Sequence, residues 1–366
     1  MVSHIHAAVV IYRIACILGD GIGPEVIEAG VRVLNTLSST LGTFEFHFTT
    51  FDWGATRLLN EGECMPSNGP DELKDYDAIY FGAVGRHGVP DELLLTSLIL
   101  PILKSLDHHV NVRPKRIFPD TTSPLIVCTP TDLDWIIICE NSEGNFSGQG
   151  GVLHQDAPHA VATEVSIFTR AGTERVMRYA FEIARSRPRK KLTMVTKMNI
   201  HNHGMALWDK VFDEVAKQYE DVQTDTMLVE AMPTRITLRP SSLDTIVATN
   251  LHADILSNLA AALSGSTGIT TWCNLDPSRK NPGLFAPNHG YAPGNARAGI
   301  ANPIGAFWSA AEIVRWVGED KTAGVLIKAI ENVTGRGIKT RDLGGSDTTN
   351  SVTVAVCAEA EKLLKA

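Results

Sequence analysis

Strand-like and helical hydrophobic patterns alternate along the chain from residue 12 onward, and this alternation most constrains the fold. An apolar run at 12–18 is followed by a glycine-rich turn and an amphipathic helical pattern. A buried strand pattern at 78–84, an amphipathic helix at 204–219 and a strand pattern at 245–249 continue the alternation. Alternating strands and helices with short connections predict an α/β protein with a mainly parallel sheet flanked by helices.

The length of 366 residues leaves room for two domain-sized cores, at roughly 150 residues per domain. Two further elements are expected from periodicity: a helix at 93–106 and a strand at 125–129. No repeats or low-complexity linkers interrupt the pattern. The chain is therefore expected to fold as two α/β domains without a flexible tether.

Composition excludes several classes of function. The formal net charge of -8 argues against a nucleic-acid-binding surface. No uninterrupted apolar run approaches the ~18 residues that a membrane-spanning helix needs. The 6 cysteines show no metal-binding spacing, which indicates free thiols in a reducing compartment. A cytoplasmic protein without nucleic-acid or membrane partners is expected.

The loop at 19–25 has neither the glycine spacing of a dinucleotide-binding turn nor the lysine of a P-loop. Later segments are more specific when they are taken together. They are Asn111-Val112-Arg113-Pro114, Glu140-Asn141-Ser142-Glu143-Gly144, Thr196-Lys197-Met198-Asn199, Ala253-Asp254-Ile255-Leu256-Ser257, His289-Gly290, Gly299-Ile300-Ala301-Asn302-Pro303 and Asp342-Leu343-Gly344-Gly345.

In this order and spacing, the segments resemble the β-decarboxylating dehydrogenases, the family of isocitrate and isopropylmalate dehydrogenases. The resemblance extends from about residue 14 to about residue 364. The segments at 84–91 and 165–170 are most similar to the tartrate and D-malate dehydrogenase subgroup.

The resemblance implies an isopropylmalate-dehydrogenase-like two-domain fold. Residues 1–104 and 256–366 would form the large α/β domain on the cofactor side. Residues 105–255 would form the second α/β domain, with a dimer arm at about 147–166. A homodimer with active sites built from both subunits is implied, acting on a small molecule.

Family enzymes oxidise a 2-hydroxy acid with NAD(P) and then lose the β-carboxylate with help from Mg²⁺ or Mn²⁺. Carried over to this sequence, Lys197 matches the general base and Arg113 matches a carboxylate-binding arginine. Asp254 matches one of three metal-binding aspartates, and the other two fall on Glu230 and Asn258.

The substrate pocket implied by the resemblance departs from the family pattern. Leu103 and Cys139 stand where the family has arginines, and Phe146 stands where it has the catalytic tyrosine. His109 falls on a further tyrosine position, whereas Asn111 is kept. A phenyl ring has no proton to donate, and losing a proton donor lowers rates by roughly 10²–10⁴.

The cofactor loop is also altered. His289, Gly290 and Asn302 match the family, but Tyr291 replaces a small residue. Gly294 replaces the acid that would accept the ribose hydroxyls, and no lysine–tyrosine pair favours NADP. The resemblance implies NAD and Mg²⁺ or Mn²⁺ as cofactors, while these changes leave open whether either binds.

Three hypotheses follow. The first is a repurposed enzyme that uses Lys197-centred acid/base chemistry on an organic acid or carbonyl compound. Decarboxylation, isomerisation or cyclisation without net hydride transfer would fit this hypothesis. The apolar replacements in the pocket also favour it, because they suit a larger or less charged ligand. The second is an NAD-dependent, Mg²⁺- or Mn²⁺-dependent tartrate or D-malate-like dehydrogenase. The third is a non-catalytic regulatory subunit.

Overall fold

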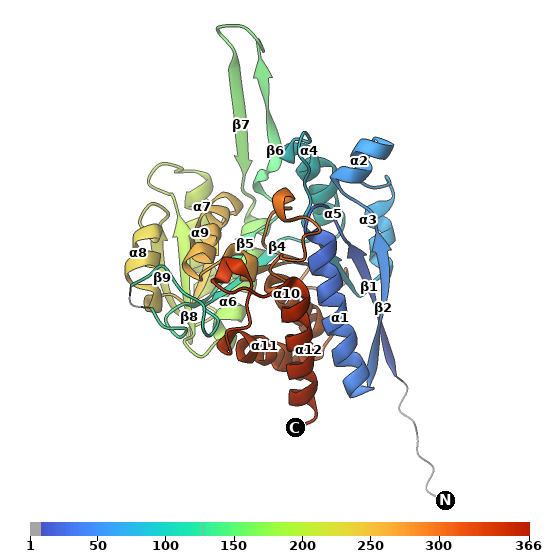
Figure 1. Cartoon of the computed structure of the whole chain (residues 1–366). Helices are drawn as coiled ribbons and strands as arrows, with labels where there is room; N and C mark the ends of the chain where they lie inside the picture. Colours follow the sequence, from blue (N-terminus) through green and yellow to red (C-terminus); the bar gives the residue numbers. More distant parts are fainter. Residues whose placement is uncertain (1–8, 127) are drawn as a thin grey trace, which may run out of the picture. The chain divides into compact units, whose positions relative to one another are not determined.

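The computed structural model describes residues 9–126 and 128–366. The chain divides into two compact units (Figure 1). Unit 1 comprises Met1–Leu106, Phe118–Thr122 and Gly265–Ala366, and unit 2 comprises Asp107–Ile117 and Ser123–Ser264. The expected boundary between residues 255 and 256 falls inside helix α9 (Asn250–Leu263), which belongs entirely to unit 2.

The described strands of unit 1 lie in the order β2-β1-β3-β12-β11. The first four run parallel to one another, and β11 is antiparallel to β12. Their bounds are β1 Val10–Ile17, β2 Phe44–Phe51, β3 Ala78–Phe81, β11 Thr271–Leu275 and β12 Gly283–Pro287. The loop at 19–21, Gly85 and His289 follow the carboxyl ends of β1, β3 and β12, so these segments meet at one edge of the sheet.

The helices of unit 1 are α1 Gly23–Leu41, α2 Ala55–Glu61, α3 Gly69–Glu72, α4 Asp91–Leu94, α5 Leu100–Ser105, α10 Ile304–Trp316, α11 Asp320–Gly335 and α12 Thr349–Leu364. Helix α10 packs on β3, β11 and β12, and α1 packs against α10 and α12. The single helix expected at 93–106 is wrong in one respect. A π-helical turn at Leu95–Ile99 separates α4 from α5, and Pro101 lies in the first turn of α5.

Helix α1 can pack directly against the Tyr80 hydroxyl of β3 because position 30 is glycine. A Cβ at Gly30 would lie 1.9 Å from Oη of Tyr80. The fully buried Tyr80 hydroxyl donates to the carbonyl of Ala306, at the start of α10, over 2.6 Å. Gly30 therefore keeps open the space in which a buried tyrosine links β3 to α10.

Replacing Gly30 with alanine should lower the free energy of unfolding by about 2–4 kcal/mol, because the methyl group overpacks the core and displaces the Tyr80 hydrogen bond. Gly324→Ala is the matched control, since a Cβ at Gly324 in α11 meets nothing within 4 Å. That variant should be stabilised by about 0.5–1 kcal/mol. Urea midpoints measure both, and equal midpoints would contradict the packing argument.

The described strands of unit 2 lie in the order β4-β5-β10-β8-β9. Strands β5, β10, β8 and β9 are parallel, and β4 is antiparallel to β5. Their bounds are β4 Val110–Arg116, β5 Asp134–Glu140, β8 Lys191–Thr196, β9 Gln223–Leu228 and β10 Thr245–Ala248. The strand expected at 125–129 is wrong for the residues that the structure describes, because 125, 126, 128 and 129 lie in no strand.

The helices of unit 2 are α6 Arg170–Ser186, α7 Gly204–Ala216, α8 Met232–Leu238 and α9 Asn250–Leu263. Alternate residues of β10 separate two cores, because neighbouring side chains in a strand point to opposite faces. Val247 packs with α6 and α7, whereas Ile246 packs with α8 and α9. Helices thus cover both faces of these parallel strands, and the expected α/β class with a mainly parallel sheet is confirmed.

Strands β6 (Gly144–Leu153) and β7 (Val161–Ile167) form a separate antiparallel hairpin. Figure 1 shows this hairpin projecting from the rest of unit 2. Every residue of β7 is exposed, including Val161, Val165 and Ile167. A two-stranded hairpin is marginal by itself, and its exposed apolar residues indicate a surface that another chain could cover. Among the described residues, no helix is long and apolar enough to cross a membrane.

Candidate functional site

Arg113 is the buried centre of a polar cluster between β4 and α9. Its Nη2 lies 2.6 Å from Oδ1 of Asp254. Nη1 donates to Oγ of Ser257 over 2.7 Å, and Nε donates to Oδ1 of Asn111 over 2.9 Å. Only 7% of Arg113 is exposed, so these partners replace the water that a buried cation loses. The structure thus brings together three predicted residues, Arg113, Asp254 and Asn111.

Cys139 borders this cluster from β5, where it pairs in register with Asn111. Its thiol is fully buried and donates to the carbonyl of Glu140 over 3.1 Å. Burial raises the pKa of Cys139 to about 12, although the charge of Arg113 acts in the opposite direction. The side chain is therefore a neutral thiol at a position where the family resemblance would place a second guanidinium.

Lys197 lies directly after β8 and forms a second cluster. Its Nζ donates to Oε1 of Glu230 over 2.6 Å, and Nδ2 of Asn199 donates to the same oxygen over 3.3 Å. The hydrogen bond from Lys197 lowers the pKa of Glu230. The Lys197 side chain is 21% exposed, so it can reach a bound molecule while its carboxylate partner orients it.

His252, near the start of α9, lies close enough to the Lys197 cluster to sense its charges. Burial, followed by the charges of His201 and Lys197, lowers the pKa of His252 to about 4. The buried Nδ1 has no hydrogen-bond partner among the described residues. His252 is therefore neutral near pH 7, and its ring can accept or donate one further hydrogen bond.

A divalent cation would need several oxygen ligands that converge on one point. In unit 2, the described residues bring no three carboxylate, imidazole or thiolate ligand atoms within 4.8 Å of one another. Asp254 and Glu230 are each held by a cation, and Nδ2 of Asn258 donates to the carbonyl of Asp254 over 3.0 Å. Within unit 2, the predicted metal residues Asp254, Glu230 and Asn258 therefore form no cation site by themselves.

The other predicted pocket residues are placed as follows. His109 is buried, and its Nδ1 lies 2.9 Å from the carbonyl oxygen of Asp107. Phe146 is partly exposed in β6, near the base of the hairpin. Leu103 is buried in α5 of unit 1.

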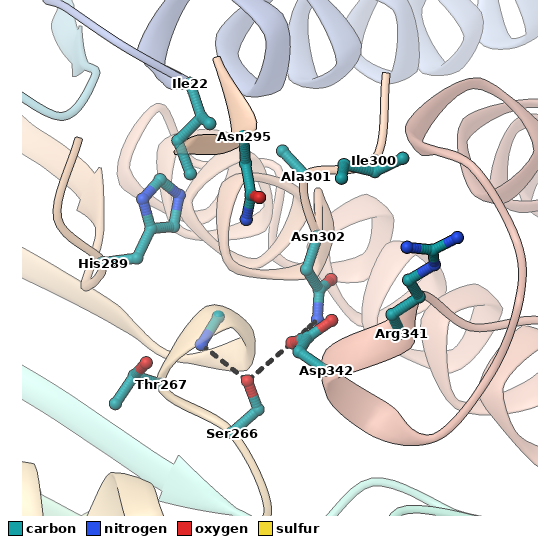
Figure 2. Close-up of a pocket in the computed structure, with 11 residues that line it drawn as sticks. Ile22, Ser266, Thr267, His289, Asn295, Ile300, Ala301, Asn302, Arg341 and Asp342 are labelled. Carbon is teal, nitrogen blue, oxygen red and sulfur yellow. Dashed lines mark hydrogen bonds between the residues drawn. The ribbon is translucent and has the colours of Figure 1, made fainter. Parts of the chain in front are cut away.

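Unit 1 holds a pocket of about 360 Å³ beside the segments that follow β12 (Figure 2). Asp342 organises one wall because its carboxylate accepts hydrogen bonds from Ser266 over 2.6 Å and from Nδ2 of Asn302 over 2.8 Å. The backbone N–H of Ile304 donates to Oδ1 of Asn302 over 3.0 Å. Both Nδ2 and Oδ1 of the predicted residue Asn302 are thus held by hydrogen bonds within the protein.

Figure 2 shows His289 and Asn302 on opposite sides of this pocket. Nδ1 of His289 lies 3.1 Å from the carbonyl oxygen of Gly290, whereas its buried Nε2 has no partner among the described residues. Burial lowers the pKa of His289, so its ring is neutral near pH 7. An unpartnered buried ring nitrogen in a pocket of this size fits a polar heterocyclic ligand.

Tyr291 lies outside the lining of this pocket. A Cβ at Gly85 would come within 2.2 Å of Cδ1 of Tyr291, so the ring covers the backbone after β3. The Tyr291 carbonyl accepts from the N–H of Ile22 over 3.0 Å. Gly290 and Gly294 have open space where a side chain would be. Because position 294 is glycine, it offers no carboxylate to accept sugar hydroxyls.

Comparison with known proteins places the chain in a family. The model of the isocitrate/isopropylmalate dehydrogenase family matches residues 13–358, and the chain belongs to this family. It is 53% identical over 346 residues to a "probable tartrate dehydrogenase/decarboxylase" of Agrobacterium vitis, covering 94% of this chain and 97% of that protein. It is 39% identical over 352 residues to the decarboxylating D-malate dehydrogenase of Escherichia coli, covering 94% and 97%.

The fold agrees with the family. The crystal structure of isocitrate dehydrogenase from Methylococcus capsulatus superposes with a TM-score of 0.85 at 29% identity, covering 96% of this chain and 99% of that chain. The predicted family resemblance, its tartrate and D-malate subgroup and the isopropylmalate-dehydrogenase-like fold are confirmed. The chain belongs to an enzyme family, and the two relatives named above are described as decarboxylating dehydrogenases.

Sequence reasoning assigned no role to Ser257 or Asp342, although both lie in segments that carried the family resemblance. Ser257 is one helical turn beyond Asp254, so that spacing could have indicated that the two side chains share one face of α9. The contact of Ser266 with Asp342 in the unit 1 pocket had no comparable signal, because the loops that carry these residues meet only in the folded chain.

Proposed function

We propose that this chain is an acid/base enzyme that uses Lys197 on an organic acid or carbonyl compound, without net hydride transfer. The observation that carries the proposal is the Lys197–Glu230 pair of 2.6 Å at the end of β8. The chain thus retains Lys197 as a proton carrier that Glu230 orients. It lacks the tyrosine and the two arginines that the family resemblance implies.

Decarboxylation of a 3-oxo acid is a reaction that these residues could assist. The bond to the carboxylate carbon breaks, CO₂ leaves, and the electron pair remains on an enolate that takes a proton on carbon. Lys197 in its ammonium form can supply that proton, and Arg113 can hold a second carboxylate of the substrate. No oxidant is consumed. Isomerisation or cyclisation through the same enolate remains within this reaction class.

A second candidate is an NAD-dependent dehydrogenase of the tartrate and D-malate type, which the unit 1 pocket favours. The unpartnered Nε2 of His289 and the fixed amide of Asn302 suit a nucleotide base. If NAD binds, it would supply the hydride acceptor, while Lys197 would remove the hydroxyl proton. Against this candidate stand Tyr291 over Gly85 and the absence of an acid at Gly294.

One experiment separates the two candidates. Calorimetric titration of NAD and NADP, with and without Mn²⁺, is followed by NMR of protein incubated with oxaloacetate, D-malate or tartrate. Product formation from an oxo acid without added nucleotide supports the proposed chemistry. NADH formation that depends on Mn²⁺ replaces it with the second candidate. No conversion by wild type and Lys197→Met alike would refute both for these substrates.

We also propose that the chain forms a homodimer through the β6–β7 hairpin, and that the 6 free cysteines fit a cytoplasmic location. Leu153 and Val161 are paired across the hairpin and are 66% and 50% exposed. Such exposed apolar pairs are typical of surfaces that a second subunit covers.

Replacing Leu153 and Val161 together with lysine should convert the dimer into a monomer in multi-angle light scattering, because four like charges would meet at the interface. The control is Leu59→Lys with Val354→Lys, which adds the same charge at exposed apolar positions of α2 and α12. The control should remain dimeric. A monomeric wild type, or a dimeric hairpin variant, would argue against the hairpin as the interface.

A further inference from the structure

A hollow of about 350 Å³ lies on unit 1 at the edge of the sheet where β3 and β12 begin. Asp77 directly precedes β3, and Pro282 directly precedes β12. Gly85 and His289 follow the opposite ends of the same two parallel strands. The hollow is therefore at the other edge of the sheet from the pocket in Figure 2, and it belongs to no site described above.

Three cations and one acid line the hollow, in a protein whose formal net charge is -8. Lys74 is paired with Asp71 at 2.6 Å. The carboxylate of Asp77 accepts from the backbone N–H of Arg13 over 2.6 Å. Arg279 and Lys280 have no carboxylate within ion-pair distance among the described residues, so two neighbouring positive charges remain without a counter-ion.

The Arg279 side chain is held in one orientation. Its guanidinium carbon lies 4.7 Å from the centroid of the Trp316 ring, and its Nη1 donates to the Trp316 carbonyl over 2.8 Å. The Trp316 indole N–H donates to the carbonyl of Asp77 over 3.1 Å, which fixes the ring. A stacked guanidinium loses little further side-chain freedom when it binds an oxyanion, and most of its donors are still available.

The turn that carries Arg279 has an unusual backbone. Arg279 has a φ of 58°, a left-handed conformation that residues with a Cβ rarely adopt. Asp276 imposes it, because its carbonyl accepts from the Arg279 N–H over 2.9 Å and its carboxylate accepts from Ser278 and Asn281. Strained residues of this kind are concentrated at sites that bind ligands.

A further donor lines the hollow. Burial, with the carboxylates of Glu319 and Asp77, raises the pKa of Tyr12, so its hydroxyl stays protonated. The same two acids disfavour a bulky anion that would extend towards them. A compact anion near Arg279 and Lys280 avoids this repulsion and can still accept a hydrogen bond from Tyr12.

We propose that this hollow binds a small multivalent oxyanion, a phosphate or a di- or tricarboxylate, through Arg279 and Lys280. The anion supplies the missing counter-charge, and its oxygens accept from the stacked guanidinium in a bidentate arrangement. The site is independent of the chemistry proposed for Lys197, because all of its residues belong to unit 1, whereas Lys197 belongs to unit 2.

Isothermal titration with pyrophosphate and, separately, with citrate tests the site at an ionic strength of about 0.01 M, where screening is weak. A dissociation constant below about 1 mM for either anion is expected, and the tighter binder identifies the class of anion. Arg279→Gly should weaken binding roughly tenfold or more. This variant should fold well, because glycine accepts the φ of 58° without strain.

Lys210→Ala with Lys217→Ala is the control for lost charge, since these residues lie on or beside α7 in unit 2. It removes two positive charges and should leave the affinity within about twofold of wild type. Absence of binding by wild type would overturn the proposal. Equal affinity of wild type and Arg279→Gly would also overturn it, because the anion would then bind elsewhere.

Discussion

Replacing Lys197 with methionine is expected to lower turnover by about 10²–10⁴, because the proton carrier of the proposed reaction is removed while its length is kept. The fold should be unaffected. Lys197 and Glu230 have side-chain exposures of 21% and 46%, and ion pairs near the surface contribute about 0–1 kcal/mol. The rate of product formation from the active substrate and the melting temperature together measure this outcome.

Lys190→Met is the matched control, because Lys190 also pairs with a carboxylate, Asp221, at 3.0 Å. It lies immediately before β8, whereas Lys197 follows that strand. The control should retain full activity. Comparable activity of Lys197→Met and wild type would show that the reaction does not pass through this amine, and the proposed function would then fail.

Much of the fold could be predicted from the sequence because its signals are local. The apolar run at 12–18 and the helical pattern after Pro24 correspond to β1 and α1, with Gly42 in a left-handed C-cap conformation at φ 68°. The run at 125–129 has the same apolar character but forms no strand in its described residues. Hydrophobicity there reflects packing of Leu125 and Cys128 against a core, which periodicity alone cannot distinguish from strand formation.

The sequence could predict which residues form the candidate site, but not which of them contact one another. The motifs identified Arg113, Asp254 and Lys197, and the fold brings the first two within 2.6 Å of each other. The sequence could not indicate that Asp254 faces an arginine, because that contact depends on how α9 packs on β4. For the same reason, the position of Tyr291 over Gly85 was open before the structure, since it depends on two loops meeting.

The loop at 19–21 illustrates how a short motif can be explained by a buried carboxylate. Asp20 is 5% exposed. Its Oδ2 accepts from the N–H groups of Ala55 and Gly85 over 2.8 and 3.1 Å. Its Oδ1 accepts from the N–H and hydroxyl of Thr56 over 2.9 and 2.6 Å. One side chain thereby joins the loop after β1, the start of α2 and the segment after β3.

Replacing Asp20 with asparagine should therefore lower the free energy of unfolding by about 3 kcal/mol. The amide keeps one acceptor oxygen but turns an NH₂ group towards backbone donors, so charge-assisted hydrogen bonds are lost and buried N–H groups are left unpaired. Asp71→Asn is the control, because Asp71 is exposed and its carboxylate pairs with Lys74 at the surface. It should cost less than about 1 kcal/mol.

Urea unfolding followed by tryptophan fluorescence measures both, since Trp53 is 2% exposed and lies beside Gly54, close to the Asp20 carboxylate. A loss below about 1 kcal/mol for Asp20→Asn would mean that the loop is held by its backbone hydrogen bonds, such as the one from Asp20 to Ala83 over 2.7 Å, and not by the carboxylate.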